Sequence, residues 1–215
     1  MPVDYAGLTY KEIRAQVHAV VLDVYPDRID DDLVKLWVQQ GHLEIDRRLR
    51  WTRTTDTITT TAADRDYARE AQWREIVAVT YDSDDYKIIQ EIDFEDYLRR
   101  YAESQVAGTP GYWATWGEFL YFYPTPDTTS DTITLYLVVP PVAMALDADV
   151  PSFNVELHWL IVDYALAKAY FHLQDINTAN NYYSKFYRDL SEWEDSIEGH
   201  RNRNISVAPT WPAHT

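Results

Sequence analysis

The sequence predicts an α+β protein in which a helical bundle of two N-terminal and two C-terminal helices carries an inserted antiparallel β layer and an extended C-terminal tail. Three observations lead to this prediction. Apolar residues recur at helical spacing before residue 50 and again after residue 157. Between these stretches, short runs of β-branched and aromatic residues are separated by turn residues. Residues 200–215 contain two prolines and scattered apolar side chains, which is typical of an extended terminus.

Residues 1–52 are expected to form a pair of antiparallel helices. Thr9 and Glu12 form a capping-box pattern at the start of the first helix, and Pro26 is expected to end it. Three aspartates at residues 30–32 precede the second helix, where negative charge suits the positive end of the helix dipole. The apolar face predicted for the second helix consists of Leu33, Leu36, Trp37, Leu43, Ile45 and Leu49.

Residues 53–141 are expected to form the inserted β region. Hairpin turns are predicted at residues 82–85 and at Gly117. Residues 93–103 are expected to be helical, because acidic residues open this segment and arginines lie near its end, as the helix dipole favours. Strands are predicted at residues 56–61, 67–69, 75–81, 86–89, 112–116, 119–123 and 132–139.

Residues 142–199 are expected to form the second helix pair and to share one domain with residues 1–52. The first helix of this pair begins near Leu157 and carries apolar residues on more than one face, which predicts a central, buried helix. The second is expected to end at Gly199 and to pack on a neighbouring helix, in the same chain or in another copy. Its heptad seam consists of Ala179, Tyr183, Phe186, Leu190, Trp193 and Ile197.

Composition limits the functions that the chain can have. The formal net charge is −16, whereas sequence-independent DNA binding needs clustered cations that displace counterions from phosphates. An ordinary acidic surface is the alternative explanation of this charge. The chain has no cysteine, which excludes disulfides and thiolate sites. No signal peptide or membrane-spanning stretch is recognised, so we expect a soluble protein made in a cytoplasm.

The sequence predicts no catalytic, cofactor or metal site. It contains no phosphate-binding loop, dinucleotide fingerprint or serine nucleophile elbow. Its six histidines form no metal-binding pair, and we interpret His158 and His172 as structural or surface residues. The many carboxylates can be paired so freely that no pair marks an acid–base dyad. We therefore expect neither a cofactor nor an enzymatic activity.

Aromatic residues suggest a recognition surface instead, because Trp and Tyr combine apolar area with a polar group. Alternation along a strand buries about half of such a cluster, so core and interface roles are weighed evenly. The first group of candidate interface residues consists of Tyr112, Trp113, Trp116, Tyr121 and Tyr123. The second group lies on the heptad seam and consists of Tyr183, Phe186, Leu190 and Trp193.

The tail at residues 200–215 is a further candidate for recognition. Its spaced apolar residues suit docking into a groove of a partner, and a disordered terminus is the alternative. The candidate docking residues are Arg201, Arg203, Ile205, Val207, Pro209, Trp211 and Pro212.

Several segments resemble the head-to-tail adaptor, or connector, proteins of tailed bacteriophages. They share turns and helices with that family and carry no catalytic signature. One example is Gly-Thr-Pro-Gly-Tyr-Trp at residues 108–113, and another is the strand that ends in Pro140 and Pro141. The strands between residues 54 and 86 match no part of the pattern. The resembling segments are residues 108–113, 118–126, 132–141, 146–151, 160–170 and 175–183.

This resemblance implies a structural virion protein at the head–tail junction, or neck, that forms a ring, usually of twelve copies, beneath the portal. Helical bundles would form the ring wall, and the extension at residues 201–215 would reach the portal. The implied partners are other copies of the chain, the portal protein, and a downstream tail or nozzle protein. DNA would pass through the lumen without specific binding, repelled by carboxylates on the wall, and no membrane partner is implied.

Two alternatives remain open. The helix pair between Leu157 and Leu190 also resembles a single tetratricopeptide repeat, which would make the chain a helical peptide-binding or scaffolding module. The sequence holds no second copy at that period, and one repeat cannot bury its own faces. An enzyme with an acidic active site is the third hypothesis, and no motif supports it.

Overall fold

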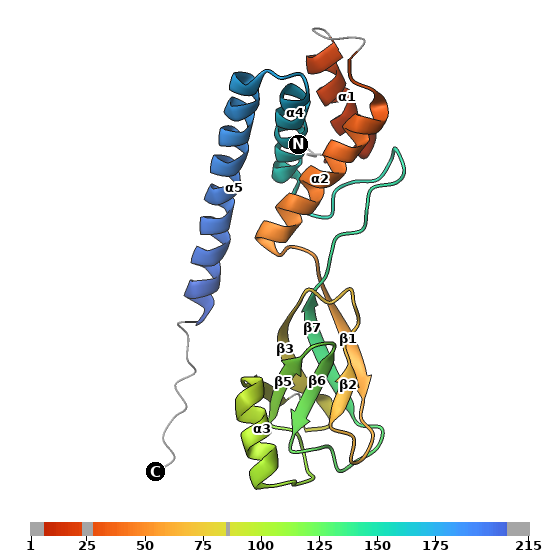
Figure 1. The fold of residues 1–215 in the computed structure, drawn as a ribbon, viewed down its shortest axis with the longest axis vertical. Helices are drawn as coiled ribbons and strands as arrows, with labels where there is room; N and C mark the ends of the chain where they lie inside the picture. Colours follow the sequence, from red (N-terminus) through yellow and green to blue (C-terminus); the bar gives the residue numbers. More distant parts are fainter. Residues whose placement is uncertain (1–6, 23–27, 85–86, 206–215) are drawn as a thin grey trace, which may run out of the picture. The chain divides into compact units, whose positions relative to one another are not determined.

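The computed structural model describes residues 7–22, 28–84 and 87–205 and confirms the α+β class (Figure 1). These described residues form five α-helices and a seven-stranded sheet. The chain divides into two compact units. The helical unit combines Met1–Trp51 with Pro141–Thr215, and the sheet unit consists of Thr52–Pro140.

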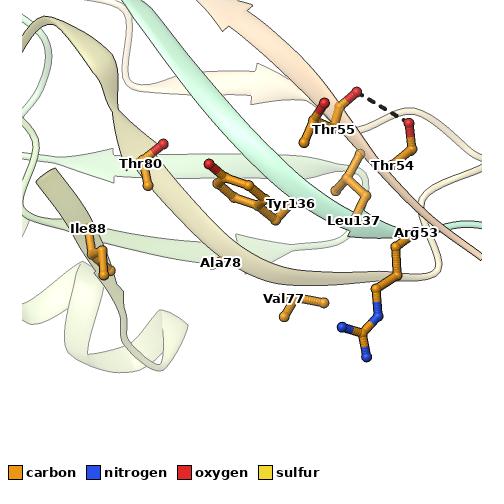
Figure 2. Close-up of a pocket in the computed structure, with 9 residues that line it drawn as sticks. All are labelled: Arg53, Thr54, Thr55, Val77, Ala78, Thr80, Ile88, Tyr136 and Leu137. Atoms are coloured by element: carbon orange, nitrogen blue, oxygen red, sulfur yellow. Dashed lines mark hydrogen bonds between the residues drawn. The ribbon is translucent and has the colours of Figure 1, made fainter. Parts of the chain in front are cut away.

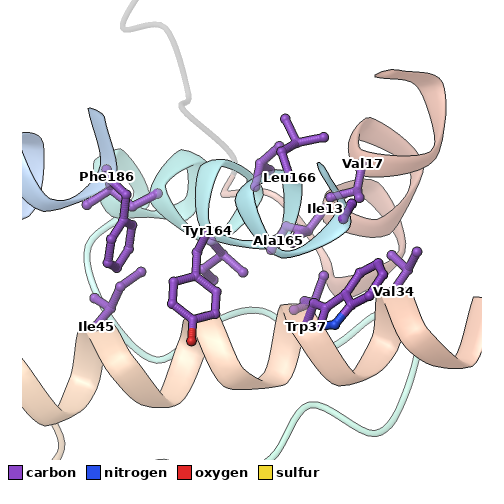
Figure 3. Packing of buried hydrophobic residues seen from close by; sticks show 14 of the residues in the cluster. Ile13, Val17, Val34, Trp37, Ile45, Tyr164, Ala165, Leu166 and Phe186 are labelled. Atoms are coloured by element: carbon purple, nitrogen blue, oxygen red, sulfur yellow. The ribbon is translucent and has the colours of Figure 1, made fainter. Parts of the chain in front are cut away.

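Four helices build the helical unit around a shared apolar core. They are α1 (Tyr10–Leu22), α2 (Asp31–Leu49), α4 (His158–His172) and α5 (Ile176–Ile205), and a short 3₁₀ turn, η2 (Val155–Leu157), leads into α4. Helix α4 packs against α1, α2 and α5, and its residues from Leu160 to Ala167 are all buried (Figure 3). The predicted central position of this helix is therefore confirmed.

Side-chain caps fix where the first two helices begin. The Thr9 amide donates to Glu12 Oε2 at 2.8 Å, and the Glu12 amide donates to Thr9 Oγ1 at 3.3 Å, which confirms the predicted capping box. Asp30 Oδ1 accepts from the amides of Asp32 and Leu33 at 2.6 and 3.1 Å. The expected helix end at Pro26 lies outside the described residues.

The buried face of α2 differs from the predicted one. Leu36 and Leu43 are 50% and 41% exposed, so their assignment to the apolar face is wrong. Val34 and Val38 are fully buried in their place. The face is turned toward Gly41, where α4 comes so close that an added Cβ would lie 3.2 Å from the Tyr164 ring. The close approach of two backbones, which hydrophobicity does not reveal, decides which face is inside.

Helix α5 packs on its own chain and is longer than predicted. Ala179, Phe186 and Leu190 are buried against the helical core, which confirms that the heptad seam packs on a neighbouring helix. The helix passes through Gly199 and continues to Ile205, so the predicted end at Gly199 is wrong. A single glycine costs about 1 kcal/mol relative to alanine inside a helix, which does not suffice to end it. Residues 200–205 are thus helical rather than extended.

The sheet unit consists of seven strands and one helix. The sheet order is β1-β7-β3-β4-β5-β6-β2, and a 3₁₀ turn, η1 (Asp82–Asp84), follows β3. The helix is α3 (Phe94–Glu103), close to the predicted span. The strands are β1 (Arg53–Thr59), β2 (Asp66–Ala68), β3 (Glu75–Tyr81), β4 (Lys87–Glu91), β5 (Tyr112–Trp116), β6 (Phe119–Tyr123) and β7 (Thr132–Val138).

Strand pairing confirms both predicted hairpins and corrects the expectation of a wholly antiparallel layer. Strands β3 and β4 pair antiparallel, as do β5 and β6, with Gly117 at φ +59° in the turn. Strands β4 and β5 are parallel, because α3 crosses between them and returns the chain in the same direction. One face of the sheet buries the core of this unit, led by Ile133, Leu135 and Leu137 of β7.

Candidate functional site

An apolar groove of about 800 Å³ lies on the sheet unit and is here called the sheet groove. Tyr136 on β7 stands beside Thr55 on β1 and Ala78 on β3 in the strand register. Val77 and Ile88 are 51% and 75% exposed, an unusual exposure for aliphatic side chains on adjoining strands. Figure 2 shows the nine lining residues: Arg53, Thr54, Thr55, Val77, Ala78, Thr80, Ile88, Tyr136 and Leu137.

The chemistry of the sheet groove suits binding rather than reaction. Its lining offers aliphatic side chains, threonine hydroxyls, one tyrosine and the guanidinium of Arg53. It contains neither a histidine nor a carboxylate that could serve as a general base. Such a surface can bury the apolar side chains of a macromolecular partner and position them against one cation.

A second exposed surface lies where α3 packs on β5 and β6, and we call it the aromatic patch: Phe94, Trp116, Phe119 and Tyr121. The Phe94 and Trp116 rings stack with centroids 4.9 Å apart, and the Phe94 and Tyr121 centroids are 5.0 Å apart. Trp116 is 63% exposed and Phe119 is 42% exposed. Tyr and Trp side chains gathered in this way are typical of protein interfaces.

Tyr97 forms the floor beneath the aromatic patch. It is 1% exposed, and its ring lies 5.7 Å from Phe94 and 5.3 Å from Tyr121. Burial raises the pKa of its hydroxyl to about 12, so the group stays protonated. No hydrogen-bond partner for this hydroxyl occurs within the described part of the chain. The patch therefore rests on a buried aromatic ring.

The structure separates the predicted interface residues into two classes. Tyr112, Tyr121, Tyr123, Tyr183 and Trp193 are partly exposed, and Trp116 is largely exposed. The remaining three are buried in the cores of the chain itself. These three are Trp113, Phe186 and Leu190, with exposed fractions of 3%, 0% and 1%.

Only part of the predicted docking tail lies among the residues that the structure describes. Arg201, Arg203 and Ile205 fall on the last turns of α5. Val207, Pro209, Trp211 and Pro212 lie outside the described residues.

A smaller groove of about 460 Å³ separates the outer surfaces of α4 and α5. Lys185 Nζ lies 2.8 Å from Asp163 Oδ2 in this groove. Burial raises the pKa of Asp163, and the hydrogen bond and charge of Lys185 lower it. The ion pair links α4 to α5, so we assign Asp163 and Lys185 a structural role. The lining consists of Glu156, Trp159, Leu160, Asp163, Lys185, Asp189, Glu192, Trp193 and Ser196.

Two histidines are buried in the described part of the helical unit. His42 and His158 are 1% and 0% exposed, and the ring of Phe153 lies between them, 5.2 Å from His42 and 5.9 Å from His158. Burial lowers the pKa of both imidazoles. His158 Nε2 lies 3.2 Å from the Phe153 carbonyl oxygen, which places this histidine in a structural role.

The described residues contain no group of three or more His, Cys, Asp or Glu side chains that could hold a metal ion. In the same part of the chain, no helix is long and apolar enough to cross a membrane.

Sequence reasoning did not find the sheet groove, although a signal for it exists. Residues 76–79 read Ile-Val-Ala-Val, and residues 88–89 are both isoleucine. Apolar runs without alternation are typical of strands that are covered on both faces. Here one of the two faces is exposed.

Comparison with known families matches residues 8–207 to the family described as SU10 adaptor protein. The matched span contains α1 to α5 and the whole sheet unit, including the strands for which no resemblance was seen in the sequence. The match gives no support to a tetratricopeptide-like module. No curated protein matches the chain.

Proposed function

Because the chain belongs to the SU10 adaptor family of phage structural proteins, we propose that it assembles into a ring beneath the portal and joins the capsid to the tail. The family match over residues 8–207 is the observation that carries this proposal. Membership in this family makes the chain a phage adaptor of the virion neck that associates with portal and tail proteins. The ring, its copy number of about twelve and its place beneath the portal are the finer steps that we propose, as in other closed rings built from one chain.

The helical unit forms the wall of the proposed ring, with residues 1–52 and 142–199 acting as one domain. The packing of α4 against α1, α2 and α5 supports this, because it makes one continuous core from the two ends of the sequence. The region at residues 53–141 supplies contacts to neighbouring copies or to the tail.

The acidic balance of the chain supports a channel through which DNA passes without adhering. A net charge of −16 repels phosphates, and this repulsion is strongest at low ionic strength. The lumen of the proposed ring is therefore lined by carboxylates.

The C-terminal end docks on the portal in this proposal. Arg201, Arg203 and Ile205 extend α5, and Val207, Pro209, Trp211 and Pro212 supply apolar side chains for a groove of the portal.

The proposal is tested by mixing the purified chain with a portal ring of the matching phage and imaging the product. We expect rotationally symmetric particles that carry one ring of adaptor chains. A chain that stays monomeric and leaves the portal unchanged would overturn the proposed ring.

Removal of residues 206–215 tests the docking tail separately. We expect portal affinity to fall at least tenfold while the helical circular dichroism signal is kept. A matched control replaces Thr210 and Thr215 by serine and leaves the apolar residues in place. Equal portal affinity of the truncated and complete chains would remove the tail from the proposal.

A further inference from the structure

We propose that the sheet unit carries both halves of a head-to-tail contact between copies, in which the sheet groove of one copy receives the aromatic patch of the next. This inference rests on the proposed ring and names the surfaces that build it. Each surface is an exposed apolar area of the kind that marks interaction sites in proteins.

Several apolar side chains of the sheet groove are not covered by other residues of the sheet unit. The pairing of β3 with β7 is irregular between Ile76 and Ala78, and Val77 at this irregularity is 51% exposed, whereas Val79 is fully buried. Ile88 is 75% exposed beside the buried Ile89 on β4. Tyr136 adds an exposed ring on β7. Burial of these side chains in a contact would remove apolar area from water, which favours association.

The aromatic patch is a matching projection. Trp116 and Phe119 flank the turn at Gly117, so the two rings stand at the tip of a hairpin. The stacking of Phe94 on Trp116 holds the tryptophan in one orientation before any partner binds. A preorganised aromatic side chain loses little conformational entropy on binding, which is why such residues act as anchors.

The two surfaces lie on different strands, so one copy can use both at once. The sheet groove is lined by β1, β7, β3 and β4, and the aromatic patch is built from α3, β5 and β6. A ring requires this arrangement, because each copy must bind a neighbour on either side through two different surfaces. A groove that bound a second groove would instead give a closed dimer.

The charges of the two surfaces are complementary. Arg53 is an exposed residue of the sheet-groove lining and also has a partner within its own chain. Glu118 is exposed in the turn between Trp116 and Phe119, and its carboxylate has no ion-pair partner within the described residues. A guanidinium can bind a carboxylate and also stack on the face of a tryptophan ring. The tip of the aromatic patch therefore offers Arg53 a carboxylate and an indole face in addition to the partner that it has within its own chain.

Three single variants test the contact by molecular mass, in the complete chain with and without the portal ring. Ile88→Asp places a carboxylate in the groove, and Trp116→Lys places a cation on the patch, so that each meets like charge on the neighbour. Val142→Asp is the matched control, since Val142 is 86% exposed and lies in the helical unit. We expect both test variants to lose ring assembly at least tenfold and the control to assemble like wild type. Circular dichroism verifies that all three fold.

Mixing the two test variants distinguishes a head-to-tail contact from other arrangements. Ile88→Asp keeps an intact patch and Trp116→Lys keeps an intact groove, so an equimolar mixture can form one wild-type contact. The other contact in the mixture sets the introduced carboxylate against the introduced ammonium, which attract each other. We expect heterodimers in the mixture, and any larger particle to alternate the two variants. Assembly of Trp116→Lys alone, or no heterodimer in the mixture, overturns the proposal.

Cysteine cross-linking provides a test that does not depend on lost assembly, because the natural chain contains no cysteine. Ile88→Cys and Trp116→Cys are mixed and treated with a bismaleimide. We expect cross-links between the two variants to exceed cross-links within either one. If wild type forms rings but neither assembly nor cross-linking depends on residues 88 and 116, only this inference fails. If wild type forms no ring at all, the proposed function fails with it.

Discussion

The ammonium of Lys185 lies 2.8 Å from the carboxylate of Asp163 and joins α5 to α4 on the outer surface of the helical unit. The two partners differ in environment, because the Asp163 side chain is 8% exposed and the Lys185 side chain is 51% exposed. Burial raises the pKa of the Asp163 carboxyl above its usual value of 3.8, and Lys185 opposes that rise. The carboxylate therefore depends on its partner more than the lysine does.

Lys185→Met is expected to destabilise the helical unit by about 1–2 kcal/mol at pH 7. The variant leaves a buried carboxylate without its cation, although the exposure of Lys185 to water limits the loss. Urea unfolding followed by circular dichroism measures the difference. Arg188→Met on the same helix is the control, because Arg188 is exposed and pairs only with its neighbour Asp189 in the described part of the chain.

The loss caused by Lys185→Met is expected to shrink between pH 7 and pH 4. Without the lysine, the folded-state pKa of Asp163 rises further above its unfolded value, so the folded variant binds a proton more readily than the unfolded chain. Protonation then removes the buried charge as the pH falls through the raised pKa. A difference between variant and wild type that is constant with pH would contradict this account.

His42→Leu is expected to make the helical unit less sensitive to acid. Burial lowers the pKa of His42 below 6.5, so the unfolded chain binds more protons than the folded chain once the pH falls through 6.5. The contribution of the neutral histidine to the free energy of unfolding is therefore complete above that pH. It falls below that pH by up to about 1.4 kcal/mol for each pH unit and each such histidine. Urea midpoints at pH 7.5 and 5.5 measure the effect. Equal losses of stability in wild type and variant would refute this account. His172→Leu is the control, because His172 is exposed on α4.

The elements of this fold and its hairpins could be predicted from local signals, but the pairing of strands and helices that are distant in sequence was predicted less well. The capping box at Thr9, the hairpin at Gly117 and the seam on α5 depend on residues close in sequence, and each is confirmed. The parallel pairing of β4 with β5 depends on where α3 crosses, which no local pattern encodes. The exposed position of Leu36 follows in the same way from the approach of α4 to α2.

The candidate surfaces were predicted only in part, for a related reason. Trp116 and Trp113 carry the same side chain on one strand, yet Trp116 is exposed and Trp113 is buried. Alternation implies that half of the cluster is buried, but the face is chosen by the strands and the helix that pack beside it. The sheet groove combines the β3–β4 hairpin with β1 and β7, which are distant from it in sequence. Only the apolar runs in β3 and β4 indicate it in the sequence.

Phe186→Ala is expected to destabilise the helical unit by about 3–5 kcal/mol. Phe186 is fully buried on the seam of α5, and its ring lies 5.2 Å from that of Tyr164 on α4, so the substitution leaves a cavity between the two helices. Thermal unfolding measures the loss. Phe171→Ala is the matched control, since Phe171 is 59% exposed on α4, and we expect its effect to stay below about 1 kcal/mol. A similar loss of stability in both variants would show that the heptad seam of α5 contributes no more to stability than an exposed position.

Tyr97→Phe is expected to stabilise the sheet unit by about 1 kcal/mol, contrary to the usual effect of a core substitution. The Tyr97 hydroxyl is buried with no partner among the described residues, so its removal ends a desolvation cost and keeps the ring contacts with Phe94 and Tyr121. Tyr81→Phe is the matched control in the same unit, because the Tyr81 hydroxyl donates to Asp131 Oδ2. We expect that variant to lose about 1 kcal/mol instead. Urea unfolding measures the free energy of unfolding of both variants, and we expect changes of opposite sign. A lower free energy of unfolding for Tyr97→Phe would mean that the Tyr97 hydroxyl has a hydrogen-bond partner.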